Sequence, residues 1–372
     1  MRKLPLAHKH LEIGARMGGF ASWEVPLFYK SIREEYFTCK NNCGLFDISH
    51  LGKFIVQGKD AEAFMEFIST RHFPEKVSPR GKVSFFLNIR GGIIDMSLIY
   101  KIEDRKFLIF TNAGAREKFF LWTSYIANQH HFDIEVEDHT EGSLLFSIQG
   151  PKSREVVKRV FSENLDSLPR FGWKKLAASN HSLMIMRSAF SYEDGFEIWH
   201  QGIDNGNIWE TLLRQITEQG GCPCGFGVRD LLRFEASLPL HGQEIDETVT
   251  PLELKKEYLI EWGKEDFIGK SSLYLERKIG PKKQLVGIEI IEGRKIPRYG
   301  YPVYSSQNLP CGYITSGNYS FMFRKILGLG FLDQQSYSPG EELIISAPGG
   351  KIKGRIVDIP FITSFPRKEN EK

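Results

Sequence analysis

The character of the sequence changes after about residue 278, and this change limits the folds that the chain can adopt. From Leu285 onward, short apolar runs alternate with turns rich in glycine, proline and asparagine. Such evenly punctuated short strands are typical of a small all-β barrel. Before residue 278, strand-like runs are mixed with unevenly spaced helices, which favours α+β layers over a doubly wound parallel sheet. The sequence therefore predicts an α+β region followed by a C-terminal β-barrel.

The α+β region contains several segments with strand or helix periodicity. Strands are predicted at 54–56, 84–87, 93–100, 106–110 and 144–148. Helices are predicted at 115–128, 151–161, 206–218 and 228–238, the second beginning with a proline suited to a first helical turn. A polar, turn-rich linker is expected at 276–283. The chain of 372 residues exceeds what one hydrophobic core usually serves, so we expect one region at 1–277 and a second at 278–372.

Composition excludes several classes of function. The 49 basic and 46 acidic residues give a net charge of +3, which is too balanced for a nucleic-acid-binding surface. No apolar run reaches the ~18 residues that a membrane helix requires. No targeting segment is recognisable at the start, so we expect a cytoplasmic protein without nucleic-acid or membrane partners. The five cysteines are expected to be free thiols, since neither the 39/43 nor the 222/224 spacing is that of a zinc knuckle.

An acid and a base stand out on either side of the helix predicted at 206–218. Glu197 ends the string Ser-Ala-Phe-Ser-Tyr-Glu-Asp-Gly-Phe-Glu at 188–197, which reads as a turn between two strands. Arg229 follows Gly225 and Gly227 and falls in the first turn of the next helix. A helix dipole disfavours a cation there unless an anion or carbonyl is its partner. The alternatives are a solvated Glu197, and an ion pair of Arg229 with a neighbouring acid.

Further strings give these residues a context. They are Gly-Gly-Phe-Ala-Ser-Trp-Glu-Val-Pro at 18–26, Gly-Leu-Phe-Asp-Ile-Ser-His-Leu-Gly at 44–52, Leu-His-Gly-Gln-Glu-Ile-Asp-Glu-Thr-Val-Thr-Pro at 240–251 and Asp-Phe-Ile-Gly-Lys at 266–270. Together they resemble the signatures of the glycine cleavage T-protein family, the aminomethyltransferases, from about residue 8 to residue 361. The resemblance implies a three-domain ring, with two interwoven α+β domains, a C-terminal barrel and folate in a central channel.

The same resemblance implies a reaction and a set of ligand contacts. The family transfers the methylene of an aminomethyl group from the lipoylated H-protein to tetrahydrofolate and releases ammonia, with no metal. Glu197 matches the family glutamate that contacts the pterin, and a carboxylate can meet the pterin edge with two parallel hydrogen bonds. Arg229 and Asn112 match family positions at the folate, and Arg367 is the counterpart of a C-terminal basic residue that grips the ligand.

The sequence departs from the family at the catalytic acid. Family members carry two glycines, two aliphatic residues and two aspartates, whereas this chain reads Gly-Gly-Ile-Ile-Asp-Met at 91–96, so Met96 replaces the second aspartate. Asp95 is the remaining candidate acid, yet adjacent strand residues point to opposite faces, so it would need a bulge or a register shift to act. The alternative function is a diverged tetrahydrofolate-binding protein with weak or different one-carbon transfer.

Other departures lie in the turn before Glu197. Ala189 and Tyr192 stand where the family has glycines, and Phe190 replaces a tyrosine. If either glycine has a positive φ in the family, this turn must differ. His50 and His241 are candidate bases by residue type, although we expect both to be structural.

Overall fold

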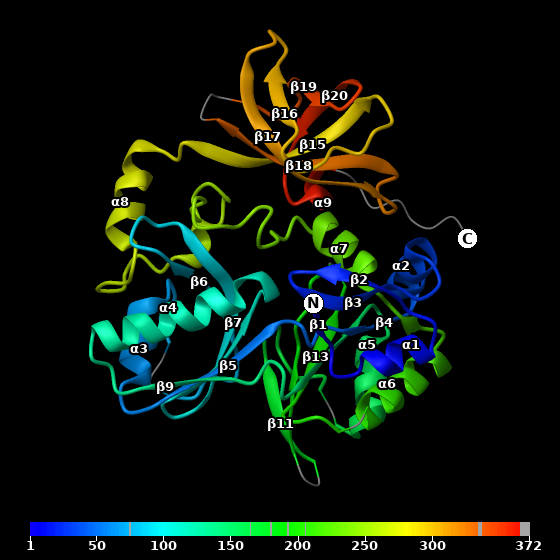
Figure 1. Cartoon of the computed structure of the whole chain (residues 1–372), viewed down its shortest axis with the longest axis vertical. Coiled ribbons are helices and arrows are strands. Elements are labelled where there is room, and N and C mark those ends of the chain that lie inside the picture. Colours follow the sequence, from blue (N-terminus) through cyan, green and yellow to red (C-terminus); the bar gives the residue numbers. More distant parts are fainter. Residues whose placement is uncertain are drawn as a thin grey trace. The chain divides into compact units, whose positions relative to one another are not determined.

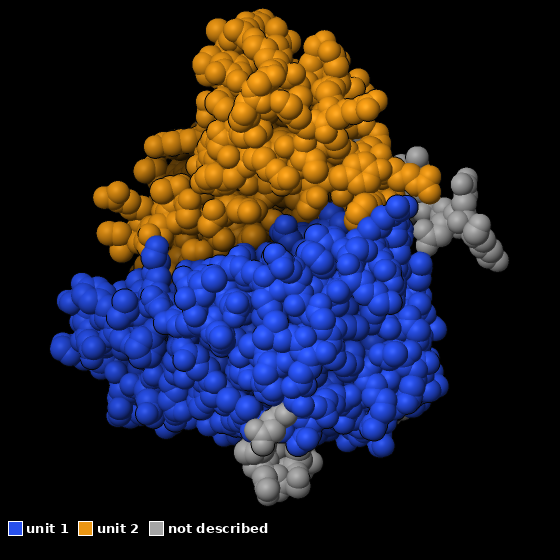
Figure 2. Space-filling view, turned by 45° about the vertical axis from the view of Figure 1, so that its right-hand side comes forward, with its two compact units in different colours: residues 1–84, 96–232 blue, residues 85–95, 233–372 orange. Residues whose placement is uncertain are grey.

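The chain forms two compact units in the computed structural model, which describes all residues except 74–75, 164, 179–180, 192, 205, 334–336 and 365–372. The first unit comprises residues 1–84 and 96–232, and the second comprises 85–95 and 233–372 (Figure 2). Each unit is therefore discontinuous in sequence. The chain passes from one unit to the other within the strands β6 (Lys82–Leu87) and β7 (Ile93–Glu103) and within the helix α7 (Phe226–Glu235).

The first unit holds a six-stranded sheet that carries the turn before Glu197 (Figure 1). Its strands, in spatial order, are β11 (Trp173–Ala178), β12 (His181–Met186), β13 (Gly195–His200), β10 (Leu144–Gln149), β4 (Gly44–Asp47) and β14 (Cys222–Pro223). Every pair is antiparallel except β14 with β4. The short β14 therefore forms one edge of this sheet.

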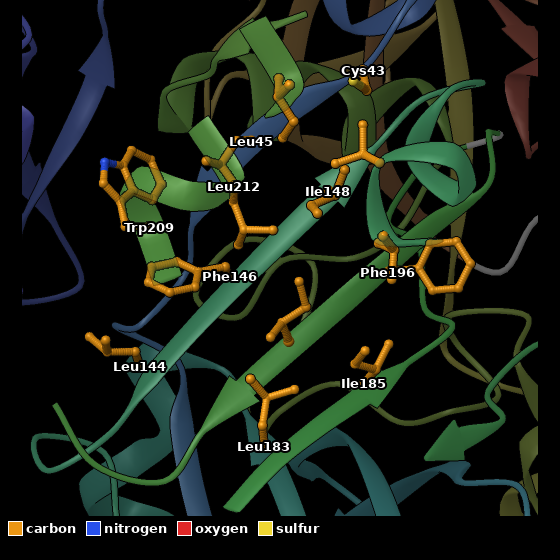
Figure 3. Close-up of a cluster of buried hydrophobic side chains, with 14 of the residues drawn as sticks. Cys43, Leu45, Leu144, Phe146, Ile148, Leu183, Ile185, Phe196, Trp209 and Leu212 are labelled. Atoms are coloured by element: carbon orange, nitrogen blue, oxygen red, sulfur yellow. The ribbon is translucent and has the colours of Figure 1, made fainter. Parts of the chain in front are cut away.

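A hydrophobic core lies between this sheet and two helices, α5 (Ser153–Phe161) and α6 (Asn207–Glu218). Trp209 of α6 packs on Phe146 of β10, and Leu212 of α6 and Ile185 of β12 belong to the same cluster of buried side chains (Figure 3). Val157 of α5 is also a member. All are at most 1% exposed. Burial of a large apolar side chain contributes about 1.5–3 kcal/mol, so this cluster fixes the sheet that positions the site.

A second sheet has the order β6, β7, β8 (Lys106–Thr111), β5 (Gly52–Gln57) and β9 (Glu135–Asp138). Phe119 of α4 (Arg116–Gln129) packs on Phe54 of β5, with ring centroids 4.9 Å apart. The helix α3 (Ala61–Ile68) buries Phe64 and Met65. These strands and helices confirm the elements predicted at 54–56, 84–87, 93–100, 106–110 and 115–128.

The remaining elements of the first unit surround a small sheet near the start of the chain. Its order is β1 (Arg2–Lys3), β3 (Trp23–Phe28) and β2 (Arg16–Phe20). The helices α1 (Ala7–Glu12), α2 (Ile32–Asn41) and the 3₁₀ turn η1 (Ala113–Ala115) complete the unit, together with most of α7 (Phe226–Glu235). Ser31 caps α2 by accepting a hydrogen bond from the backbone N–H of Glu34.

The second unit contains the predicted barrel, which is closed. Its strands, in spatial order, are β15 (Lys283–Glu292), β18 (Lys325–Asp333), β17 (Pro310–Ser320), β16 (Pro302–Ser305), β19 (Glu342–Ala347) and β20 (Gly350–Val357). Ile288, Ile314 and Ile345 fill the interior. The same unit holds η2 (Glu257–Leu259), α8 (Lys270–Ile279) and α9 (Phe361–Ser364). The α+β region and the C-terminal barrel are thus both present as predicted.

The structure corrects some element boundaries. The predicted linker at 276–283 is wrong over 276–279, because α8 continues to Ile279 and ends at Gly280, whose φ is +87°. The predicted proline start of the second helix is also wrong, since α5 begins at Ser153 and Pro151 precedes it. Within the described residues, no helix is long and apolar enough to cross a membrane.

Candidate functional site

Glu197 lies in β13, in the middle of the six-stranded sheet, where it pairs with Met186 on one side and Ser147 on the other. Its side chain is partly exposed. Burial raises the pKa of Glu197, while the positive charge of Arg229 and a hydrogen bond from Ser188 act in the opposite direction. The structure therefore places the predicted acid and base close enough to interact, both within the first unit.

Arg229 sits in the first turn of α7, as predicted, although the helix begins earlier than the sequence indicates. It starts at Phe226, so that Gly227 belongs to the helix and only Gly225 to the preceding loop. A Cβ on Gly225 would lie 2.2 Å from the carbonyl oxygen of Leu27, so only glycine fits there without displacing the backbone. This close approach fixes where α7, and hence Arg229, emerges from the loop.

The ring face of Phe190 packs against the guanidinium of Arg229. The Cζ atom of Arg229 lies 4.9 Å from the centroid of the Phe190 ring, within cation–π range. Phe190 is 8% exposed and packs edge-on against Phe46, with centroids 5.3 Å apart. Phe190 thus gives Arg229 an apolar, aromatic platform.

The turn that carries Phe190 is held by Gln149 of β10. The side-chain amide of Gln149 donates to the carbonyl oxygen of Ser188, and its oxygen accepts from the hydroxyl of Ser191 at 3.2 Å. Ala189 is absent from the described residues with positive φ, so alanine is compatible with this turn. Tyr192 lies outside the described residues.

His50 is close to Arg229 and deeply buried. It is 1% exposed, and neither ring nitrogen forms a hydrogen bond within the described part of the chain. Phe20 and Phe226 contact its ring edge-on, at centroid distances of 5.7 and 6.3 Å. Burial and the charge of Arg229 lower the pKa of His50 to about 3, so its imidazole is neutral at physiological pH.

Tyr100 is a buried polar residue near Glu197 that the sequence does not single out. Its hydroxyl forms no hydrogen bond among the described residues, and the ring is fully buried. Burial and the negative charge of Glu197 raise the pKa of Tyr100 well above its ordinary value. Tyr100 belongs to an apolar strand pattern in the sequence. Its hydroxyl is therefore the only feature that could have marked it as a candidate functional residue.

Met96 of β7 and Asn112, just after the neighbouring strand β8, are joined by a hydrogen bond. The side-chain amide of Asn112, which follows β8, donates to the backbone oxygen of Met96 at 3.4 Å. Met96 is partly exposed, whereas Asp95 and Ser97 on either side are at most 1% exposed. This alternation is the one expected of a regular strand, so Asp95 and Met96 face opposite sides of β7.

The remaining candidates from the sequence are Arg367 and His241. Arg367 lies outside the described residues. His241 is partly exposed and forms an isolated bridge with Ile245. The described residues contain no group of three or more His, Cys, Asp or Glu side chains that could hold a metal ion.

Glu197 and the residues near it are a candidate site, and their side chains are of the types that recognise a flat polar ligand. A carboxylate and a guanidinium supply charge-assisted hydrogen bonds, and the buried phenol and imidazole add neutral polar groups. Phe20, Phe190 and Phe226 supply apolar surface. Such a combination of apolar walls and few convergent polar groups is typical of small-molecule sites.

Two family models match the chain. Residues 6–264 match the GCVT N-terminal domain, and residues 283–362 match the glycine cleavage T-protein C-terminal barrel domain. The boundary between the matches precedes β15, the first barrel strand.

Similar proteins cover the whole length of the chain. Aminomethyltransferases of Thermotoga sp. (strain RQ2) and Thermotoga maritima are each 34% identical to it over 370 residues, covering 99% of this chain and 100% of the relative. The crystal structure of glycine cleavage system aminomethyltransferase T from Bartonella henselae is 26% identical, covers 99% of both chains and superposes with a TM-score of 0.89.

Proposed function

The chain belongs to the glycine cleavage T-protein family, the aminomethyltransferases, and from this premise we propose that it passes the methylene carbon of an aminomethyl group to tetrahydrofolate. The donor is the lipoyl arm of an H-protein, and ammonia is released. Tetrahydrofolate is a substrate, and the reaction uses no metal. A cytoplasmic location and a functional division at residue 277 are part of the same proposal.

The observation that carries the proposal is that Glu197 and Arg229 lie close enough for the charge of Arg229 to act on the Glu197 carboxyl. Glu197 binds the amino and ring N–H edge of the pterin through two parallel hydrogen bonds. Arg229, held over Phe190 at 4.9 Å, faces a carbonyl or carboxylate of the folate. Asn112 orders the backbone at Met96 and borders the ligand. Arg367 grips the folate from the C-terminal segment.

The folate nitrogen is the nucleophile in this reaction, so the protein mainly orients two substrates. Holding reactants in position can supply several powers of ten in rate without an acid or base. A positioned acid commonly adds about 10² to 10⁴-fold. Because Met96 cannot donate or accept a proton, we propose that transfer proceeds but is slowed. Asp95 is the remaining carboxylate in the motif.

The exposure pattern of β7 favours a second candidate function. Met96, at the family acid position, is the partly exposed residue, and Asp95 is fully buried on the opposite face. A protein with this strand could bind tetrahydrofolate and carry out little aminomethyl transfer, or move a different one-carbon unit.

A single assay separates the two functions. The full-length protein is incubated with aminomethylated H-protein and tetrahydrofolate, and methylenetetrahydrofolate and ammonia are measured. A matched reaction without the protein gives the background, and Glu197→Ala is the control for the folate site. Product above background supports transfer. Tetrahydrofolate binding without such product would assign the chain to the second function, and failure to bind would overturn both.

A further inference from the structure

Two thiols face each other where β14 runs into α7. The Sγ atoms of Cys222 and Cys224 are 3.7 Å apart. Cys222 is partly exposed, whereas Cys224 is 1% exposed. Pro223, between them, cannot donate a backbone hydrogen bond, and β14 pairs only with β4 at the edge of its sheet. The pair is therefore accessible through Cys222 and lies at the edge of the sheet.

The two thiols differ in acidity. A hydrogen bond from Cys224 and another from Thr38 lower the pKa of Cys222, although burial and the charge of Glu35 oppose them. Burial raises the pKa of Cys224 well above the ordinary value of a thiol. Cys222 thus forms a thiolate more readily and is exposed enough to meet a small oxidant, the two properties that make a cysteine reactive.

We propose that Cys222 and Cys224 are a modification site, a dithiol that hydroperoxides oxidise to a disulfide. The sulfur of Cys222 attacks one peroxide oxygen, the O–O bond breaks, and Cys222 becomes a sulfenic acid, with release of water from hydrogen peroxide or of the corresponding alcohol from an organic hydroperoxide. The thiol of Cys224 then attacks that sulfur, the S–S bond forms, and water leaves. Two thiols lose two electrons and the hydroperoxide gains them, so no further reductant or oxidant is needed.

The other three cysteines of the chain are worse placed to react. The Cys39 thiol is 2% exposed and donates to the carbonyl oxygen of Gln149 at 3.4 Å. Burial raises the pKa of Cys43 to about 12. Cys311 is buried in the barrel. Selectivity for Cys222 and Cys224 therefore follows from exposure and acidity together.

Disulfide formation moves the start of α7. The two sulfurs must approach by about 1.7 Å to reach a bond length of ~2.0 Å. Cys224 donates its backbone N–H to Leu45 at 2.8 Å, and the next residue, Gly225, donates to Glu35 at 2.9 Å. Because these bonds anchor the loop before α7, we expect the disulfide to strain them and to loosen the first helical turn.

The experiment uses the full-length protein and hydrogen peroxide. After oxidation, blocking of free thiols and tryptic digestion, both cysteines remain in one peptide, residues 215–229, while Cys39 and Cys43 fall in two others. We expect this peptide to escape blocking and to lose the mass of two hydrogens. Cys222→Ser and Cys224→Ser should each abolish that product, whereas the matched control Cys311→Ser should retain it.

Other products would overturn the proposal. A disulfide that joins residues 215–229 to the Cys39 peptide identifies a different pair, and accumulation of sulfinic acid on Cys222 shows that Cys224 does not resolve the sulfenic acid.

Hydrogen exchange of the Gly225 and Arg229 amides tests the effect of the disulfide on α7. Exchange should be faster in the oxidised protein, and equal rates would overturn the link to α7. Oxidation needs neither folate nor H-protein, so these results are independent of the proposed transfer.

Discussion

The carboxylate of Glu35 accepts the backbone N–H of Gly225, with 2.9 Å between Oε2 and N, and so ties α2 to the loop before α7. The other oxygen of Glu35 accepts the backbone N–H groups of Tyr29 and Lys30, at 2.7 and 2.9 Å. Glu35 is 2% exposed, and burial raises its pKa despite these hydrogen bonds. One buried side chain therefore satisfies donors from two distant segments and sets the position from which Arg229 projects.

Replacing Glu35 by alanine should reduce the free energy of unfolding by at least about 1–3 kcal/mol, because three backbone N–H groups lose their acceptor. Urea unfolding followed by circular dichroism measures the change. Glu34→Ala is the matched control, since that neighbour forms only an exposed ion pair with Lys30 and should alter stability by less than about 1 kcal/mol. Equal effects of the two variants would contradict the anchoring role of Glu35.

Removal of the Glu197 carboxylate should weaken tetrahydrofolate binding by at least about 1–3 kcal/mol, the usual cost of leaving a buried polar edge without its partner. Titration calorimetry of Glu197→Ala and Glu197→Gln measures this change. The control is Glu193→Ala, an acid in the preceding turn whose side chain is bonded to Lys40 at 2.7 Å. Unchanged affinity in both Glu197 variants would remove this residue from the site.

Phe190 offers a test of how Arg229 is held. Phe190→Leu keeps an apolar side chain but removes the aromatic face, so we expect tetrahydrofolate to bind more weakly by about 0.5–2 kcal/mol. The matched control is Phe171→Leu, which removes a similar contact beneath Arg170, at 5.2 Å, in the same unit. If both variants bind with the affinity of the unaltered protein, the position of Arg229 does not depend on Phe190.

The strands that frame the site were predictable because their signals are local. Apolar runs on both sides of a polar turn predict the hairpin that ends at Glu197, and β12 and β13 form it. The position of Arg229 in the first turn of a helix was equally predictable, because glycines precede a segment whose apolar residues recur at helical spacing. The prediction missed the start of α7 by two residues because glycine is normally a loop signal, whereas Gly227 lies in the helix, where a Cβ would meet the end of the Ile32 side chain at 2.6 Å.

What the sequence could not predict are the contacts between distant segments. Gln149 holds the turn at Ser188, and Glu35 holds Gly225, yet neither residue belongs to a recognisable motif. Tyr100 was missed for the same reason, since its hydroxyl approaches Glu197 only after β7 and β13 are folded. The approach of Cys222 to Cys224 was visible as spacing, but their unequal exposure depends on the sheet edge that β14 forms.

His50 should make the protein less stable in acid. The pKa of His50 is about 3 in the folded protein and about 6.5 in an unfolded chain. Between these two pH values the unfolded state binds a proton at His50 and the folded state does not. The stability present above pH ~6.5 is therefore lost as pH falls towards ~3, with a slope of up to about 1.4 kcal/mol per pH unit.

His50→Phe removes this titration, and urea unfolding at several pH values between ~6.5 and ~4 should show a shallower dependence than in the unaltered protein. The comparison is with His8→Gln, which removes an exposed histidine side chain instead of a buried one. A His50→Phe profile that coincides with that of the unaltered protein would show that His50 takes up protons equally in both states.

Met96→Asp should raise the rate of aminomethyl transfer, because it restores a carboxylate on the partly exposed face of β7, the face that Asp95 does not share. A positioned acid or base commonly contributes about 10² to 10⁴-fold, so an increase of about tenfold or more is expected even if its placement is imperfect. Met96→Asn is the matched control, since asparagine has the shape of aspartate but no ionisable group.

The rate is measured as methylenetetrahydrofolate formed from aminomethylated H-protein at saturating tetrahydrofolate, so that changes in folate affinity do not affect it. An increase in the aspartate variant alone assigns the slow step to the missing carboxylate. If both variants, or neither, gain activity, the limitation lies elsewhere in the site, and the altered turn at Ala189 and Phe190 becomes the next segment to restore.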